Sequence, residues 1–127
     1  MILDTNALSA FVDGEPEVGR ILSRQRRVAL PVIVLGEFRY GISQSRYRAA
    51  YESWLAAHLG DFDILDVTDE TASTYAEVRV GLKRSGKPIP ANDAWIAALA
   101  IQHALPLLSR DEHFDAVAHL ERRTWQG

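Results

Sequence analysis

Short apolar runs alternate along this chain with longer segments of helical periodicity, and this alternation constrains the fold more than any other feature. The runs typical of buried strands are 1–3, 28–30, 63–67 and 106–109, with a fifth candidate at 120–125. The helical segments between them are 17–25, 31–43, 46–59, 69–85 and 93–104. Such alternation is the signature of a parallel sheet covered by helices. We therefore predict a single three-layer α/β/α domain with a parallel sheet of four to five strands.

Local signals predict where some of these helices begin and end. Pro31 suits the first turn of the helix at 31–43, and Asp69 is a good N-cap for the helix at 69–85. The stretch SGKPIP then breaks that helix. The segment 93–104 is apolar nearly all round, so we expect this helix to be buried.

Composition narrows the class of protein. The chain has 127 residues, 47% of them hydrophobic, which is enough to bury a proper core. It has no cysteine, so disulfides and thiolate metal sites are excluded, as is typical of a reducing cytosol. No apolar run approaches the roughly 18 residues of a membrane span, and the N-terminus lacks the basic region of a signal peptide. We expect a cytoplasmic protein.

Acidic residues fall at the ends or in the first turns of the predicted buried elements. Asp4 ends the first strand, and Asp111 follows the fourth strand by two residues. In open α/β sheets, ligands bind beyond the carboxyl ends of the strands, where the strand order reverses. If the first and fourth strands are neighbours, these two carboxylates meet there. Glu37 lies among apolar neighbours in its helix, and Asp93 lies in the first turn of the most hydrophobic helix.

Each of these acids also has a simpler interpretation. Asp4 can cap a helix that starts at Thr5, and Asp111 can cap the short helix DEHFDA. Asp93 can complement the positive end of its helix, and Glu37 can be a solvated position. As a set they are harder to explain by four independent caps. A buried carboxylate cluster raises its own pKa values unless a cation sits inside it. All-oxygen ligands select a hard cation, Mg²⁺ or Mn²⁺.

Four motifs carry a resemblance to a known family. They are LDTNALSAF at the start, LGEFRYGI around Glu37, PANDAWIAALA around Asp93 and LLSRDEHFDAV around Asp111. With these motifs the chain resembles the PIN-domain nucleases, and most closely the VapC-type ribonuclease toxins of prokaryotic toxin–antitoxin pairs. The resemblance covers essentially the whole chain, 1–127, as one PIN-like nuclease domain. It implies the strand order 3-2-1-4-5, Mg²⁺-dependent cleavage of RNA, and inhibition by a small antitoxin protein.

The resemblance also implies which residues form the site. The four acids that it places in the catalytic metal site are Asp4, Glu37, Asp93 and Asp111. Thr5, Asn6 and Ser109 would support this site from nearby. The chain departs from the family in two places: its first strand is short, and Ala118 and His119 stand where many relatives carry a glycine.

The remaining charge bears on how a nucleic acid would be held. The formal net charge of −3 argues against binding by bulk positive charge alone. Setting the four site acids aside (−3 + 4) leaves +1 for the rest of the chain. The basic clusters are Arg24, Arg26 and Arg27, then Arg46 and Arg48, then Lys83, Arg84 and Lys87. The third cluster adjoins the Gly-Pro loop before Asp93, so it is the best candidate for contact with phosphate.

The histidines give no clear signal. None has metal-ligand spacing with another histidine, so we expect all of them to be structural or surface residues. Whether His113 or Asp115 contributes to the site is left open by the sequence.

A protein partner is expected on a separate surface. Five aromatic residues are predicted to line a groove between the helices at 31–43 and 46–59, where an antitoxin helix would dock: Phe38, Tyr40, Tyr47, Tyr51 and Trp54. Tyr47, Tyr51 and Trp54 could alternatively form the surface of a homodimer.

Two other functions fit parts of the sequence. One is a PIN-like module that binds RNA or protein without catalysis, against which the full set of acids argues. The other is a phosphatase similar to the haloacid dehalogenases, because LDTN ends the first strand with an aspartate. That chemistry needs a second aspartate where this chain has Asn6, and a lysine near Asp111, which this chain lacks.

Overall fold

A five-stranded parallel sheet in the order β3-β2-β1-β4-β5 forms the centre of the computed structural model, which describes residues 1–125. The strands are β1 (Ile2–Leu3), β2 (Ala29–Pro31), β3 (Asp63–Leu65), β4 (Leu107–Leu108) and β5 (Arg122–Arg123). Each neighbouring pair is parallel. The predicted sheet and its strand order are therefore confirmed, and every strand except β2 is shorter than its predicted range.

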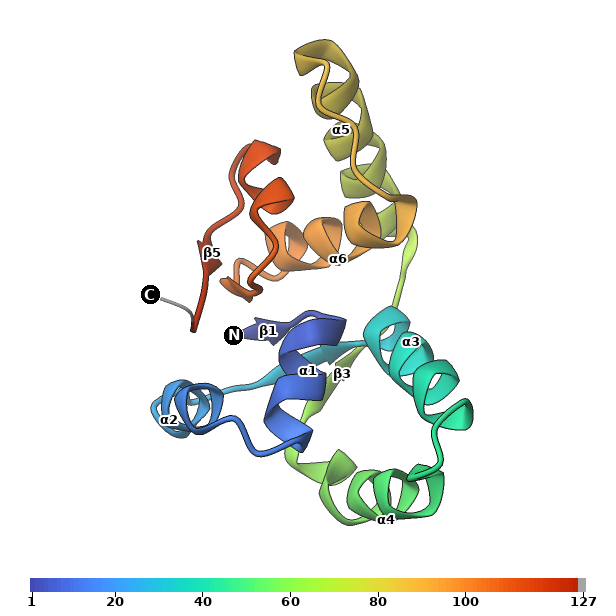
Figure 1. The fold of residues 1–127 in the computed structure, drawn as a ribbon. Helices are drawn as coiled ribbons and strands as arrows, with labels where there is room; N and C mark the ends of the chain where they lie inside the picture. Colours follow the sequence, from blue (N-terminus) through green and yellow to red (C-terminus); the bar gives the residue numbers. More distant parts are fainter. Residues whose placement is uncertain (126–127) are drawn as a thin grey trace.

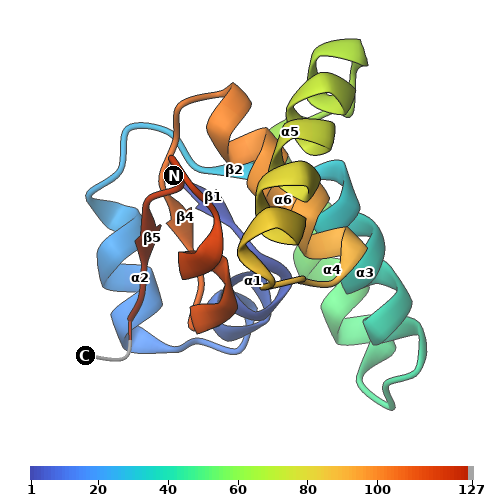
Figure 2. The same ribbon diagram turned by 90° about the horizontal axis from the view of Figure 1, so that it is seen from above.

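Helices lie on both sides of the sheet, as Figure 1 shows with α5 and α6 above the strands and α1, α2 and α4 below. The helices are α1 (Thr5–Val12), α2 (Pro16–Ser23), α3 (Val32–Ser43), α4 (Arg48–His58), α5 (Asp69–Ser85) and α6 (Ala91–Gln102). Two short 3₁₀ helices complete the fold, η1 (Leu59–Asp61) and η2 (Glu112–Ala116). Figure 2 shows α6 beside both α5 and α3, while α5 projects beyond the sheet.

Several helix boundaries differ from the predicted ones for local reasons. The helix α1 begins directly after Asp4, as the capping interpretation of that residue required. Pro31 belongs to β2 and is the N-cap of α3 rather than its first helical residue. The helix α6 starts at Ala91, two residues before the predicted start, because Pro90 is its N-cap.

The N-cap of α5 is Thr68, so the prediction of Asp69 was wrong by one residue. The Thr68 hydroxyl accepts a hydrogen bond from the Thr71 backbone N–H at 3.4 Å, and the Thr68 N–H donates to the Thr71 hydroxyl at 3.0 Å. This reciprocal capping box satisfies donors that the first helical turn leaves free. At the other end, Gly86 adopts a φ of +69°, the left-handed conformation that glycine tolerates best.

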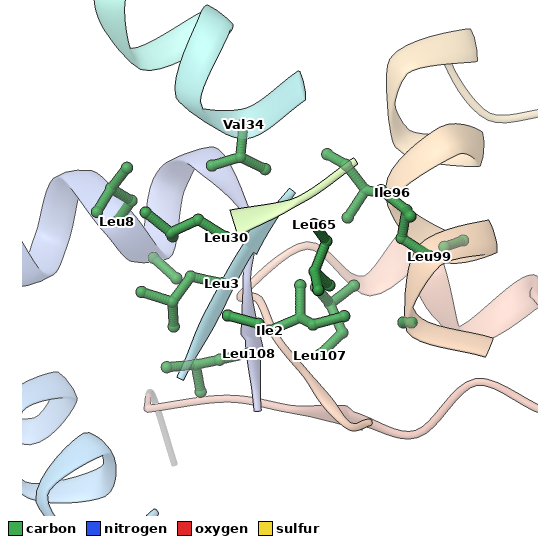
Figure 3. Close-up of a cluster of buried hydrophobic side chains, with 14 of the residues drawn as sticks. Ile2, Leu3, Leu8, Leu30, Val34, Leu65, Ile96, Leu99, Leu107 and Leu108 are labelled. Carbon is green, nitrogen blue, oxygen red and sulfur yellow. The ribbon is translucent and has the colours of Figure 1, made fainter. Parts of the chain in front are cut away.

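The core is built from the strands and from the helix faces that cover them (Figure 3). Ile2, Leu3, Leu107 and Leu108 are all fully buried, because β1 and β4 lie in the middle of the sheet. Six consecutive or near-consecutive residues of α6 are buried as well, which confirms the prediction of a buried helix. Among residues 1–125, the helices are too short or too polar to cross a membrane.

The capping of α5 gives a direct test of this part of the fold. We expect Thr68→Ala to lower the free energy of unfolding by about 1 kcal/mol, because it removes the N-cap acceptor. Asp69→Asn should lower it by only a few tenths, roughly the loss of one charge near a helix N-terminus. Urea unfolding followed by circular dichroism measures both. A larger effect of Asp69→Asn than of Thr68→Ala would contradict the assignment, and Ser73→Ala on the exposed side of α5 is the control.

Candidate active site

The carboxyl ends of β1 and β4 bring the first acidic side chains together. The two strands pair in parallel, with Ile2 opposite Leu107 and Leu3 opposite Leu108. The Asp4 backbone N–H donates to the Leu108 carbonyl at 3.3 Å, which continues this pairing by one residue. The adjacency that the sequence could only assume is therefore confirmed. Asp4 and the segment after β4 emerge at the same edge of the sheet.

Asp4 has two roles in the structure. It is the N-cap of α1, and its Oδ1 accepts a hydrogen bond from the Ala7 backbone N–H at 2.8 Å. It is also buried, with 4% of its surface exposed, and close enough to Asp93 and Asp111 for their charges to act on it. The helix cap thus fixes a carboxylate that also faces the other acids. The two interpretations of this residue are not alternatives.

Asp111 is likewise a cap, at the start of η2. Its Oδ1 accepts from the His113 backbone N–H at 3.2 Å, and its own N–H donates to the Ser109 hydroxyl at 3.0 Å. Ser109 is fully buried, and its hydroxyl also forms a hydrogen bond to Asp4. One buried serine therefore links the acid after β1 to the acid after β4.

His113 lies between two of the acids, which the sequence analysis did not predict. Its Nδ1 is 2.7 Å from an oxygen of Asp111, and its Nε2 is 2.9 Å from an oxygen of Asp93. The sequence left open whether His113 contributes to the site, and the structure places it in contact with two of the acids. Asp115 does not join the cluster and is paired with Arg122 at 2.8 and 2.9 Å.

Asp93 completes the most compact part of the site. It lies in the first turn of α6 and is half-buried. A carboxylate oxygen of Asp93, a carboxylate oxygen of Asp111 and a ring nitrogen of His113 all lie within 4.8 Å of one another. These three side chains come from α6 and η2, two elements that are not adjacent in sequence.

Glu37 approaches the cluster from α3. Its Oε1 accepts a hydrogen bond from the Thr5 hydroxyl at 3.1 Å, so the residue after Asp4 orients it. Its charge acts on Asp93. Asn6 is exposed, and its side chain makes no hydrogen bond to an acid within residues 1–125. Of the three predicted supporting residues, the structure brings Thr5 and Ser109 to the acids and leaves Asn6 beside them.

Burial makes the negative charges of this site unfavourable in the protein alone. It raises the pKa of Asp4, and the charges of Asp93 and Asp111 raise it further, while the bonds from Ser109 and Ala7 lower it. Burial also raises the pKa of Asp93, as do the charges of Glu37 and Asp111, while His113 acts in the opposite direction. The four acids are therefore coupled electrostatically.

This arrangement fits a divalent cation. Carboxylate oxygens are the ligands that hard cations prefer, and burial, with repulsion as a smaller contribution, raises the pKa values of Asp4 and Asp93. The Nε2 atom of His113 is buried and, despite its 2.9 Å approach to Asp93, has no partner with hydrogen-bond alignment among the described residues. A cation among the carboxylates would remove the repulsion that the protein alone cannot relieve.

Two grooves open beside the acids. The first, here called the Glu37 groove, has a volume of about 280 Å³ and is lined by residues of α1, α3 and α4 that include Thr5, Glu37 and Tyr51. The second, here called the inner groove, measures about 330 Å³ and includes Lys87 and His113. Two other phosphate contacts were predicted. Lys83 lines a third groove, between α5 and the loop before α6, and Arg84 does not line any of these three grooves.

The predicted aromatic surface is only partly present. Phe38 is buried in the core, where its ring packs edge-on against Tyr51. Trp54 packs against the rings of Phe11 in α1 and of Phe62, which follows η1. Tyr40 and Tyr47 are exposed, at 72% and 57% of their surface. The five residues therefore do not form one aromatic groove, because the helical pattern of α4 places Trp54 toward the sheet.

Comparison with known proteins relates this geometry to a family. Residues 1–120 match the sequence model described as PIN domain. Ribonuclease VapC5 of Mycobacterium tuberculosis is 34% identical over 118 residues, which are 91% of this chain and 86% of that protein. VapBC2 from Rickettsia felis, crystallised with a DNA fragment from their promoter, has a TM-score of 0.90 at 27% identity, covering 98% of both chains. VapBC-5 from Mycobacterium tuberculosis, described as a member of the VapBC family of toxin-antitoxin systems, has a TM-score of 0.74 at 31% identity, covering 97% of this chain and 94% of that one.

The raised pKa values predict how stability depends on pH. Because folding raises the pKa of Asp4 above its ordinary value of 3.8, the stability linked to its protonation is fully present below about pH 3.8. That stability is lost as the pH rises through the folded-state pKa. In EDTA at pH 7 we therefore expect Asp4→Asn to be more stable than the wild type, by on the order of 1 kcal/mol. The difference should vanish at low pH.

Urea unfolding at pH 4 and pH 7 measures this effect. Mg²⁺ should stabilise the wild type and leave Asp4→Asn unchanged. Asp66→Asn, which removes an exposed acid of the same type, is the control and should show no difference. If Asp4→Asn were less stable than the wild type in EDTA at pH 7, the unfavourable burial and repulsion of the Asp4 charge would not be the dominant effect.

Proposed function

The chain belongs to the PIN-domain family, and from this premise we propose that it is a divalent-metal-dependent ribonuclease and the toxin of a toxin–antitoxin pair. Relatives that match most of the chain are named ribonucleases, and solved structures with the same fold are VapBC complexes. The observation that carries the proposal is the cluster of four acids, one buried and three half-buried, that gathers at the carboxyl ends of β1 and β4. The domain would span 1–127 and act in the cytoplasm.

The acids of the cluster would hold the metal, which we propose to be Mg²⁺, with Mn²⁺ as a substitute. Asp4 and Asp93 are the proposed main ligands, and Glu37 and Asp111 would bind through water or hold a second ion. When bound, such an ion lowers the pKa of a coordinated water and stabilises negative charge on a phosphate. Attack of water on phosphorus with departure of the 3′-oxygen leaves a 5′-phosphate and a 3′-hydroxyl.

The neighbouring side chains would keep the acids in place. Ser109 holds Asp4 through its hydroxyl, and Thr5 holds Glu37. His113 contacts Asp93 and Asp111 and so sets the distance between α6 and η2 at the site. Such hydrogen-bonding partners of metal ligands fix their orientation before the substrate arrives. Asn6, exposed beside Asp4, is free to approach the substrate.

RNA would approach over the inner groove. Lys87 lines this groove together with His113, so it is the proposed contact for a phosphate next to the cleaved bond. Lys83 lies further along the same surface.

A small antitoxin would cover the Glu37 groove. Its walls combine the apolar side chains of Phe38 and Ile42 with the polar groups of Ser9 and Asp13. An amphipathic helix suits such a surface, and a basic side chain from the partner could reach Glu37 at its end. A homodimer is a further proposal, for which exposed Tyr47 offers a contact.

A catalytically silent PIN-like module is the second candidate. It would keep the fold and the partner but lack cleavage, so an activity measurement separates the two. A phosphatase of the haloacid-dehalogenase type finds no support, because the residue two positions after Asp4 is the exposed Asn6.

Cleavage of RNA tests the proposal directly. The purified chain, free of any co-purifying protein, should cut cellular RNA in Mg²⁺, stop in EDTA and recover when Mg²⁺ or Mn²⁺ is restored. Asp93→Asn should lower the rate of cleavage by more than about 100-fold. Losing a residue that only hydrogen-bonds a metal ligand costs about 10-fold to 100-fold, and losing the ligand itself should cost more. Asp66→Asn serves as the matched control. Full activity in EDTA would disprove the metal mechanism. If the wild type did not cleave RNA, the catalytically silent module would be the better explanation.

Co-expression tests the proposed partner. Expression of the wild-type chain alone should arrest growth, and co-expression with the product of the neighbouring gene should restore it, with the two proteins purifying as one complex. Asp93→Asn alone should be harmless yet still bind the partner. Harmless expression of an active chain with no retained partner would contradict the toxin assignment.

A further inference from the structure

A groove next to the inner groove combines apolar walls with positive charge. It lies between the last turns of α5 and the loop that leads to α6, and we call it the basic groove. Its lining includes Arg79, Val80, Lys83, Pro88 and Ile89. Its volume of about 360 Å³ is near the lower end of the range of about 300–1,000 Å³ for small-ligand sites. It is large enough for one flat ring system and its attached phosphate.

The basic groove is continuous with the proposed active site. Pro88 and Ile89 line both this groove and the inner groove, which contains His113. His113 in turn contacts Asp93 and Asp111. An extended chain that leaves the acidic cluster past His113 therefore meets Lys87 and then crosses Pro88 and Ile89 into the basic groove.

The cations of the basic groove are not neutralised by the protein. Arg27 and Arg48, from the two other basic clusters, form ion pairs with Asp63 and Glu52. Within residues 1–125, neither Arg79 nor Lys83 forms an ion pair with a carboxylate. Unpaired cations beside a proposed nuclease site are suited to phosphate.

The side chain of Arg79 is held in position by an aromatic ring. Its guanidinium donates to the Tyr75 hydroxyl at 2.6 Å and lies 5.6 Å from the centre of the Tyr75 ring. An arginine fixed in this way loses less freedom when a ligand binds. Beside it, 47% of the surface of Val80 is exposed, which leaves an aliphatic side chain available for contact with a ligand.

We propose that the basic groove binds one nucleotide of single-stranded RNA adjacent to the cleaved phosphodiester. The base would lie against Val80, Pro88 and Ile89 and stack on the Arg79 guanidinium, and Lys83 would contact its phosphate. Unpaired bases are recognised in this way, by stacking on flat groups with cations along the backbone. The inference rests on the proposed ribonuclease function and adds a substrate subsite to it.

A nucleic acid fits this groove better than a protein does. Its lining contains no aromatic side chain that could anchor a partner helix. Its continuity with the acids suits a substrate that must reach them. Of the acids at the neighbouring inner groove, Asp115 is neutralised by Arg122, so Glu112 is the opposing charge along the path.

The test compares substitutions in the Asp93→Asn protein, which is expected to cleave RNA more than about 100-fold more slowly, so that RNA stays intact and binding is read without cleavage. The probe is a fluorescent single-stranded oligoribonucleotide at several salt concentrations in Mg²⁺. Lys83→Gln should raise the Kd about threefold to tenfold and reduce the dependence of log Kd on log salt by about 0.7. Val80→Ser should raise the Kd about threefold without changing the salt dependence, because it removes apolar contact only. Arg84→Gln removes the same charge from the next residue, which lies outside the groove, and should change the Kd less than about twofold.

Three results would overturn the subsite. One is an equal effect of Arg84→Gln and Lys83→Gln, which would mean bulk attraction only. Another is no effect of Lys83→Gln or Val80→Ser. The third is a loss of antitoxin binding in Lys83→Gln with RNA binding unchanged, which would make the groove a protein-docking surface. These experiments measure binding constants, so a result that contradicts the subsite can be told apart from a wild type that does not cleave RNA, which would contradict the proposed function.

Discussion

The burial of negative charge at one edge of the sheet is the constraint on which the rest of this structure depends. β1 is only two residues long and is followed at once by Asp4, which is 4% exposed. A carboxylate in that position is destabilised by the loss of water, and its neighbours Asp93 and Asp111 add repulsion. The fold tolerates this unfavourable free energy because β1 and β4, which precede the acids, are fully buried and contribute favourable packing. A bound cation would offset this unfavourable charge.

Local structure keeps the acids at fixed positions. Asp4 and Asp111 each cap a helix, so a backbone N–H holds one oxygen of each carboxylate. Ser109 connects the two through its hydroxyl. Arg122 supports the same segment, since it donates to the Ser109 carbonyl at 3.1 Å and pairs with Asp115 on η2. A site that is oriented before any ligand arrives needs little rearrangement to bind one.

The sequence was sufficient to predict those features that follow from periodicity and from strand ends. The alternating pattern predicted the strands, and the family motifs implied their order, which the structure confirms. Asp4, Asp93 and Asp111 could be chosen because each follows or begins a predicted element, and Glu37 because it lies among apolar residues within its helix. Features set by three-dimensional contacts could not be predicted. His113 enters the cluster only because η2 turns it back toward α6, and Trp54 faces the core because of where α4 packs. Thr68 and Asp69 are adjacent and both are good N-cap residues, so only the hydrogen-bond geometry of the folded chain shows that Thr68 is the N-cap.

The account predicts that the cluster binds a metal ion, and a crystal structure of the chain grown in Mn²⁺ tests this most directly. Anomalous scattering should locate an ion among Asp4, Asp93 and Asp111, with carboxylate oxygens about 2.0–2.3 Å away. The His113 ring should lie beside these ligands. If the ion were absent from the cluster at saturating Mn²⁺, or bound only at exposed acids such as Asp66, the central claim would be contradicted.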